Sequence, residues 1–555
     1  MVLTAANESR TGEKKCLRSW KEIASYIHAS VATVQRWEKL EGLPVHRHLH
    51  SKLGSAYAFS SEIDDWQIGR APSMHSVTVP TISLDSPPRK PVIAVLPLEN
   101  LTGDADQDYF ADGLTEEIIT EMGRLFADRI GVIARTSVMR YKSKGMNVRR
   151  IARELGVGYV LEGSFRRAEV KVRVAVQLID AAKQTHLWAK AYERPIGDIF
   201  RVQCEIAQAI AEKVGVQLGS FSCGQDARRN VEAYDFYLKG RFEWYKLSRE
   251  HFDIALKYFE LAAEKDPDYA LAYAGVADVW FIRGDNGIIP ARDAYPAAQA
   301  ALSRALQLDA SLADVHVISA NCKFAYEWDW SGAEAEFLRA LELNPNSAHA
   351  HFMYADFLVS MRRFDEASGE MARVLQLDPF NHFFRCFVGW HLLYRGCDND
   401  AIAQLRQTVR AEAHLPAAHL GLWGALHRKG MDSEALAEAR TFYKLLDDGE
   451  IAETLGAGVN HDYAEAMRTA ADKLAARSAR TFVPAVRIAR LYAQAGASAD
   501  ALHWLERASE DREPPLVHLT VGWDWDNLRA EGRYQQLLHG MNLPHLPNGV
   551  LVVAS

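Results

Sequence analysis

The segments ALKYFELAAEKDP (255–267), AEAEFLRALELNP (333–345) and ASGEMARVLQLDP (367–379) share one pattern, which decides how most of the chain folds. In each, a small residue is followed at offsets of 4, 7 and 12 by a large apolar residue, a small or branched residue and a proline. The last two copies begin 34 residues apart. Small residues at helical spacing let a neighbouring helix approach closely, so the pattern predicts stacked helix pairs.

Weaker copies of this pattern begin at Ala298, Ala401, Ala435 and Ala501. The pattern resembles the tetratricopeptide repeat. This resemblance implies an all-α superhelix of about seven units over residues 233–513, with an inner surface that binds a protein or peptide partner. A C-terminal cap and tail are expected from 514–555. The insertion GDNGIIPARDAYP lengthens the second unit, and the repeat register between 449 and 480 stays open.

Residues 91–220 show a different pattern, in which strand and helix signals alternate. VIAVLPL (92–98) is an apolar run typical of a buried strand, and DYFADGLTEEIITEMGRL (108–125) has a helical period. Three later segments, 159–167, 170–179 and 186–192, alternate like antiparallel strands. The expected architecture is an α/β domain with a mixed sheet. The motifs IAVLPLENLTGDADQDYFADGLTEEIITEM, GYVLEGSFRR and HLWAKAYER resemble the TolB amino-terminal-like domain of bacterial multidomain regulators.

The N-terminal stretch SWKEIASYIHASVATVQRWEKLEGLPVHRHLHSKLGSAYAFSSEIDDW (19–66) predicts a small winged helix-turn-helix domain over 16–70. Ser19 and Glu22 have the spacing of a capping box, and Ser30 can cap a second helix. VHRHLH and SKLGSAYAF are typical of the two strands of a wing. Residues 71–90, rich in proline and serine, are expected to form a flexible linker.

The second predicted helix has the outward side chains that a recognition helix needs in the major groove of duplex DNA. Candidate contacts to bases or the groove are Thr33, Gln35 and Arg36. Candidate phosphate contacts are Lys39, His46, Arg47, His48 and Lys52. The segment SVATVQRWEKLEGLPVHR resembles the winged helix-turn-helix of MerR-type and excisionase-type DNA-binding domains. The alternative is a small helical domain that binds no nucleic acid.

Alternation places His46, His48 and His50 on one face of a strand. Two interpretations are equally open, phosphate contact and a solvated wing face. A metal site is disfavoured because no cysteine or carboxylate is spaced nearby to supply a fourth ligand.

Composition and missing motifs limit the remaining possibilities. The net charge of −8 belongs to the C-terminal part, because residues 1–70 and 89–220 each carry a small positive excess. Six cysteines without a CxxC pair predict neither a disulfide framework nor a thiolate metal site. No apolar run approaches the roughly 20 residues of a membrane helix. We therefore expect a cytoplasmic protein without a membrane partner. Phosphate-loop, GxSxG and HExxH motifs are absent, so we expect no enzyme and no cofactor or metal.

These patterns together predict a DNA-binding transcriptional regulator whose α/β and repeat regions sense a signal or bind a partner protein. A homodimer is possible, because one small DNA-binding module gives modest affinity. The alternative is a non-enzymatic interaction scaffold, in which the repeats bind peptides and the N-terminal module docks a protein.

Overall fold

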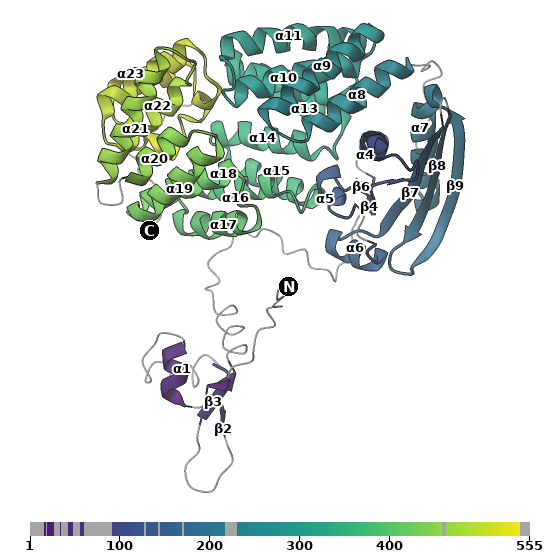
Figure 1. Cartoon of the computed structure of the whole chain (residues 1–555), viewed down its shortest axis with the longest axis horizontal. Coiled ribbons are helices and arrows are strands. Elements are labelled where there is room, and N and C mark those ends of the chain that lie inside the picture. Colours follow the sequence, from purple (N-terminus) through teal and green to yellow (C-terminus); the bar gives the residue numbers. More distant parts are fainter. Residues whose placement is uncertain are drawn as a thin grey trace, which may run out of the picture. The chain divides into compact units, whose positions relative to one another are not determined.

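The computed structural model of the chain (Figure 1) describes residues 16–17, 19–26, 34, 43–47, 56–59, 91–126, 129–142, 145–168, 171–216, 230–457 and 462–543. The chain divides into two compact units, Met1–Thr81 and Ile82–Ser555, and each is described by itself. No helix within these described ranges combines the length and hydropathy of a membrane span.

The first unit contains an antiparallel three-stranded sheet in the order β1-β3-β2 and one described helix. The elements are β1 Cys16–Leu17, α1 Trp20–Tyr26, β2 His46–Arg47 and β3 Ala56–Phe59. The backbone N–H of Glu22 donates to Ser19 Oγ at 3.2 Å, as the capping-box spacing predicts. Ile23, Val34 and Ala58 are fully buried in its small core. The complete winged helix-turn-helix extends beyond the described residues and stays a prediction.

The second unit begins with an α/β domain whose sheet is mixed, as predicted. The strand order is β6-β4-β7-β8-β9, with parallel pairing from β6 to β7 and antiparallel pairing from β7 to β9. β5 also pairs with β7 in parallel. The strands are β4 Val92–Val95, β5 Glu99–Asn100, β6 Gly131–Val132, β7 Tyr159–Ala168, β8 Lys171–Asp180 and β9 Thr185–Pro195.

Helix boundaries in this domain coincide with residues that favour the start or the end of a helix, as α6 illustrates. They are α4 Asp108–Phe126, α5 Arg135–Met139, α6 Val148–Leu155 and α7 Ile199–Val214. Asn147 caps α6 through a hydrogen bond from Arg149 N, and Gly156 ends it with φ of 67°. Antiparallel β8 alternates buried and more exposed residues, because one face meets the core.

Paired helices form the rest of the second unit (Figure 1). The pairs are α8 Val231–Trp244 with α9 Arg249–Lys265, α10 Ala270–Asp285 with α11 Ala291–Leu308, α12 Ala313–Cys322 with α13 Trp330–Leu343, α14 Ala348–Ser360 with α15 Phe364–Leu377, α16 His382–Tyr394 with α17 Asp398–Ala411, α18 Pro416–Arg428 with α19 Asp432–Leu445, α20 Gly449–Ala457 with α21 Tyr463–Ser478, and α22 Ala485–Gln494 with α23 Ser498–Glu510. The short helices η5 Pro514–His518 and η6 Trp523–Trp525, and then α24 Gly532–Gly540, complete it.

The small residues of the repeated pattern allow this close packing. Ala255, Ala333 and Ala367 are fully buried. Phe259, the large residue of the first copy, lies between two glycines. A Cβ added at Gly240 or Gly275 would come within 2.6 Å of its ring. The repeat pattern therefore corresponds to interlocking helix faces, as expected.

A histidine joins the two helices of three pairs in the same way. Its Nδ1 meets a glutamate of the second helix, in the pairs His316–Glu336 (2.6 Å), His351–Glu370 (2.5 Å) and His419–Glu438 (2.6 Å). Its Nε2 meets the carbonyl oxygen six residues earlier, at 2.9, 3.1 and 3.0 Å. In α16 the equivalent carbonyl contact is made by Arg385, which donates to Pro379 O at 2.9 Å.

The insertion GDNGIIPARDAYP in the second repeat contacts a late helix pair, and the superhelix closes on itself there. Arg487 Nη2 donates to Asn286 O at 3.0 Å, and Arg292 pairs with Asp511 at 3.1 Å. Gly287 has φ of 62°, and a Cβ there would lie 2.7 Å from Pro484. An early and a late pair of the superhelix therefore touch.

The α/β domain packs against the superhelix through a shared core and buried polar contacts. One apolar cluster runs from the sheet through α4 and α7 into α8 to α10. Asp235 of α8 accepts hydrogen bonds from Tyr109 (2.5 Å) and Arg167 (2.8 Å). Glu116 of α4 forms an ion pair with Arg241 of α8 and accepts a hydrogen bond from Tyr245.

One expectation about the cysteines needs correction. Cys204 of α7 is disulfide-bonded, whereas Cys322, Cys386 and Cys397 are free. Cysteine spacing alone did not indicate this, because no CxxC pair is present.

Candidate ligand-binding cavity

A cavity of about 1520 Å³ lies inside the second unit. The inner helices of the pairs, α8, α10, α12, α14, α16 and α18, contribute to its wall. Further lining comes from α4 and α5 of the α/β domain and from the segment 513–525. The volume exceeds the roughly 300–1,000 Å³ of a pocket for a drug-sized ligand, so an extended ligand also fits.

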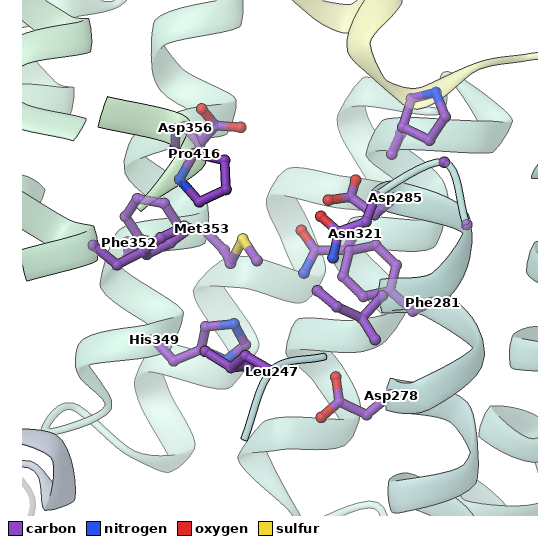
Figure 2. Close-up of a pocket in the computed structure, with 18 of the residues that line it drawn as sticks. Leu247, Asp278, Phe281, Asp285, Asn321, His349, Phe352, Met353, Asp356 and Pro416 are labelled. Atoms are coloured by element: carbon purple, nitrogen blue, oxygen red, sulfur yellow. The ribbon is translucent and has the colours of Figure 1, made fainter. Parts of the chain in front are cut away.

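Apolar side chains form much of the wall. Figure 2 shows Phe281 on one side of the cavity, and Phe352 and Met353 on the other. Phe281 and Phe352 are each only 3% exposed, so their positions are fixed by packing behind them. This wall suits the apolar body of a ligand.

Two carboxylates on α10, Asp278 and Asp285, interrupt the apolar wall (Figure 2). Their spacing of seven residues places them on the same side of the helix. Both are half-buried, and within the described residues neither accepts a hydrogen bond or forms an ion pair. Burial raises the pKa of Asp278 to about 7, although Arg241 lowers it and Asp314 raises it further. Burial raises the pKa of Asp285 to about 6, with Asp356 adding to the effect and His518 opposing it.

Asn321 of α12 lies beside Asp285 at the cavity (Figure 2). Asn321 is 3% exposed, and its side-chain Nδ2 has no hydrogen-bond partner among the described residues. A buried amide donor without an acceptor costs about 1–3 kcal/mol. A bound ligand with an acceptor oxygen would remove this cost.

His349 of α14 faces the same space across the cavity (Figure 2). Burial lowers the pKa of its imidazole, with Asp314 opposing and Arg241 reinforcing the shift. His349 is therefore neutral at pH 7 and does not balance the nearby carboxylates.

A buried ionic cluster forms the end of the cavity next to the α/β domain. Glu116 lies between Arg241 and Arg135, whose Nε is 3.7 Å from Glu116 Oε2. Burial raises the pKa of Glu116, but the two arginines outweigh burial and hold that pKa below its usual value. The ring of Tyr245 stacks 3.9 Å from the Arg135 guanidinium. The contacts of Glu116 with Arg241 and Tyr245 join the domains, whereas Nε of Arg135 and Nε of Arg241 have no hydrogen-bond partner among the described residues.

The segment 513–525 supplies a second polar region, and its charges are also paired. His518 Nε2 lies 3.0 Å from Asp356, and Arg490 donates to Asp524 at 2.7 Å. A Cβ at Gly424 would overlap Trp523, which shows how closely this segment packs against α18. Within the described residues, no three His, Cys, Asp or Glu side chains are arranged to hold a metal ion.

Most of the predicted DNA contacts lie outside the described residues. This applies to Thr33, Gln35, Arg36, Lys39, His48 and Lys52. His46 is in β2 opposite Tyr57 of β3, and the two rings stack with centroids 5.2 Å apart. Arg47 follows in β2, where its backbone pairs with Ala56. These residues remain a predicted site, which the structure does not test.

Sequence reasoning missed the cavity carboxylates, although a signal was present. The helix ALAYAGVADVWFIRGD is apolar on all sides, which indicates burial, yet it carries Asp278 and Asp285 seven residues apart. Carboxylates on a buried helix indicate either partners or a cavity. Distinguishing these requires the positions of the neighbouring helices.

Comparison with known proteins gives one family match. Residues 89–208 match the family described as HilA/YgeH-like transcriptional regulator, second domain. This range corresponds to the α/β domain, which therefore resembles a domain of transcriptional regulators. The finer resemblance to a TolB amino-terminal-like domain stays a prediction.

One curated relative is the protein named "Putative adenylate cyclase 3" from Rhizobium meliloti (strain 1021). It is 35% identical over 265 residues, and the match covers 44% of this chain and 44% of that protein. The chain thus spans less than half the length of this relative. The expectation that the chain is not an enzyme is contradicted by this relationship and is withdrawn. Its basis was the absence of familiar local motifs, and such motifs do not transfer between all enzyme families.

Three solved structures are similar to parts of the chain. Human IFIT1, solved as a dimer with m7Gppp-AAAA, has a TM-score of 0.34 and 15% identity, covering 57% of this chain and 80% of that one. YrrB, a TPR protein with an unusual peptide-binding site, has a TM-score of 0.24 and 19% identity, covering 35% and 95%. TolB from Acinetobacter baumannii has a TM-score of 0.18 and 21% identity, covering 25% and 31%.

Proposed function

We propose that the chain is a DNA-binding transcriptional regulator, in which the N-terminal unit binds duplex DNA and the second unit receives the regulating signal. The observation that carries this proposal is the match of residues 89–208 to a domain of transcriptional regulators. The capped helix α1 and the β2–β3 strand pair support it, because a winged helix-turn-helix would contain a helix and a strand pair of this kind.

The recognition helix follows α1 in this proposal. Thr33, Gln35 and Arg36 contact base edges or the groove, and Lys39, Arg47 and Lys52 contact phosphates together with His46 and His48. The unit is small, so tight binding requires two copies on neighbouring half-sites. We accordingly propose a homodimer on DNA.

A gel-shift titration of the full-length protein on a DNA site selected from random sequences tests the proposal. Arg36→Ala is expected to weaken binding by roughly 10-fold or more, the loss of about 1–3 kcal/mol for a base contact. Lys21→Ala is the matched control, since Lys21 is an exposed cation on α1 outside the recognition helix. Binding should also weaken steeply with salt. Full-length protein without salt-dependent DNA affinity would contradict the proposal.

The signal is received in the cavity of the second unit. A protein segment or small ligand there contacts helices from most of the pairs and two helices of the α/β domain at once. Ligand binding can therefore change the packing of the α/β domain on the superhelix. This supports a regulatory role for the cavity.

A second candidate function is cyclisation of ATP. It is favoured by the 35% identity, over 265 residues, to a protein named as an adenylate cyclase. Full-length protein incubated with ATP and Mg²⁺ or Mn²⁺, with cyclic AMP measured by mass spectrometry, tests it. Product that increases with protein concentration would support the candidate. Absence of product in both metals would leave the regulator as the sole proposal.

A further inference from the structure

We propose that the Asp278–Asp285 face of the cavity binds a ligand carrying a primary ammonium or guanidinium group with a carbonyl or hydroxyl oxygen close to it. The inference deepens the proposed function and rests on it only for the regulatory consequence, because ligand binding is measurable without DNA.

The two carboxylates have the geometry of a binding site more than of a structural ion pair. Both face the cavity from one side of α10 (Figure 2). Two other cavity acids have partners, since Asp356 pairs with His518 and Asp524 with Arg490, whereas Asp314 lines the cavity without a partner among the described residues. Asp278 and Asp285 form no ion pair within the described part of the chain. A half-buried carboxylate without a partner is costly, and a ligand cation in the cavity would offset that cost.

Asn321 gives an independent indication of a ligand. Its residue is 3% exposed and lines the cavity, and its Nδ2 donor has no acceptor among the described residues. A ligand with only a cation would leave this donor unsatisfied. An oxygen next to the cation, like that of a peptide carbonyl or an amino alcohol, would satisfy both Asn321 and the carboxylates.

The charges around the carboxylates favour a cation. Asp278 faces Arg241 of α8, Asp314 of α12 and His349 of α14. Asp285 faces Asp356 of α14 and His518. Arg241 shares the Glu116 carboxylate with Arg135, and His518 is paired with Asp356. Asp278, Asp285 and Asp314, when ionised, outnumber the one guanidinium charge that Glu116 leaves unbalanced, so the charge at this face is negative and repels an anionic ligand.

The surrounding wall accommodates the rest of the ligand. Phe281 follows Asp278 by less than one helical turn, and Phe352 and Met353 lie opposite (Figure 2). Aromatic rings next to carboxylates bind the methylene stem of a lysine or an alkylamine and also attract its charge. The shared chemistry is an ammonium group on an apolar stem, either free or in a peptide.

Cation binding must be linked to proton release. Burial raises the pKa of Asp278 to about 7 and of Asp285 to about 6, so both are partly protonated near neutral pH. A bound cation stabilises the ionised carboxylates, and the protons leave to the buffer. Affinity should therefore rise as pH increases from about 5.5 to about 8. A structural role for these residues would give no such linkage.

Calorimetric titration of the full-length protein tests the proposal, with acetyl-Phe-Lys-Phe-amide and aminopentanol as the two probes. Each is compared with its uncharged counterpart, acetyl-Phe-norleucine-Phe-amide or pentanediol. Titrations in buffers of different ionisation enthalpy report the protons released. Binding of aminopentanol identifies a free amine as sufficient, whereas binding of the lysine peptide alone identifies a peptide segment. Either result supports the proposal if the uncharged counterpart binds at least 10-fold more weakly.

The variants Asp278→Asn and Asp285→Asn should each weaken binding of the charged probe at least 10-fold and reduce proton release. Asp365→Asn is the matched control, because the Asp365 side chain is 97% exposed and does not line the cavity. Circular dichroism verifies that each variant is folded. Equal binding of the charged and uncharged probes, no binding of either charged probe, or unchanged binding in both cavity variants would overturn the inference. The calorimetric titration contains no DNA, so none of its outcomes contradicts the proposal that the N-terminal unit binds DNA.

Discussion

Ser137 of α5 donates a hydrogen bond of 2.6 Å to Asp378, in the turn between α15 and α16, and so joins the α/β domain to the middle of the superhelix. Two backbone N–H groups donate further hydrogen bonds here. Ala134 N donates to Leu377 O at 2.8 Å, and Phe380 N donates to Ser137 Oγ at 2.9 Å. Asp378 is 2% exposed, and burial raises its pKa although Ser137 and Asn381 lower it. Contacts at α8, at Asn346 before α14 and at this turn hold the α/β domain against the superhelix.

Ser137→Ala should destabilise the second unit, because it leaves the buried Asp378 carboxylate with fewer donors. The expected loss is about 1–3 kcal/mol in the free energy of unfolding, measured by urea denaturation. Ser303→Ala is the control, since Ser303 is exposed and its hydroxyl bonds only within α11. Equal stability of the two variants would show that the Ser137 contact does not hold the domains together.

Arg241→Met should be more harmful than the double variant Glu116→Gln with Arg241→Met. Removal of Arg241 alone leaves the Glu116 carboxylate buried with less compensation, a change that typically costs about 3–5 kcal/mol. Neutralising Glu116 as well should recover part of the lost free energy of unfolding. A double-mutant cycle by denaturant unfolding measures the coupling. Additive losses in the cycle would mean that the two side chains do not interact.

Asp278→Asn should stabilise the ligand-free protein at high pH. The folded-state pKa of about 7 lies above the ordinary aspartate value of 3.8. The Asp278 carboxyl therefore does not lower the free energy of unfolding below the unfolded pKa. Its destabilising effect grows as the pH rises from the unfolded pKa through the folded pKa. At pH 8 the variant should gain on the order of 2 kcal/mol, with a smaller gain at pH 5.5. Thermal melts at both values check this, and a gain that does not depend on pH would refute it.

The His316–Glu336 and His419–Glu438 bridges should lose strength as pH rises. The hydrogen bond to Glu336 raises the pKa of His316, and for His419 the contacts with Glu438 and Ala413 O outweigh burial and also raise the pKa. Their stabilising effect is complete below the unfolded pKa of about 6.5 and is lost as pH rises through the folded pKa. His419→Gln should therefore lower the melting temperature at pH 6 more than at pH 8.5. Identical differences at both pH values would exclude an ionised bridge.

Gly287→Val should weaken the closure of the superhelix. The left-handed φ disfavours a branched side chain, and the added Cβ would meet Pro484. Hydrogen exchange should increase in the 284–290 loop and around Pro484, with α14 to α17 unchanged. Gly430→Val is the comparison, because Gly430 has a similar φ of 67° but no atom near its Cβ position. Equal effects of the two variants would attribute the change to backbone strain alone.

The sequence predicts those parts of the fold that rest on local chemistry. Ala333 and Ala367 indicate close helix packing, and the alternation in 171–180 indicates a strand with one buried face. Long-range relationships were not predictable. Nothing in the sequence around Gly287 indicates that Pro484 will lie against it. Asp278 and Asp285 likewise become a candidate site only because α12 and α14 leave a cavity in front of them.

Genome-wide DNA enrichment with the full-length protein in cells, compared with Arg36→Ala, tests whether the N-terminal unit binds DNA sites. We expect discrete enriched sites that share a sequence motif and that disappear or weaken strongly in the variant. Enrichment that is absent, or that is identical for both proteins, would contradict the proposal that this chain regulates transcription by binding DNA through its N-terminal unit.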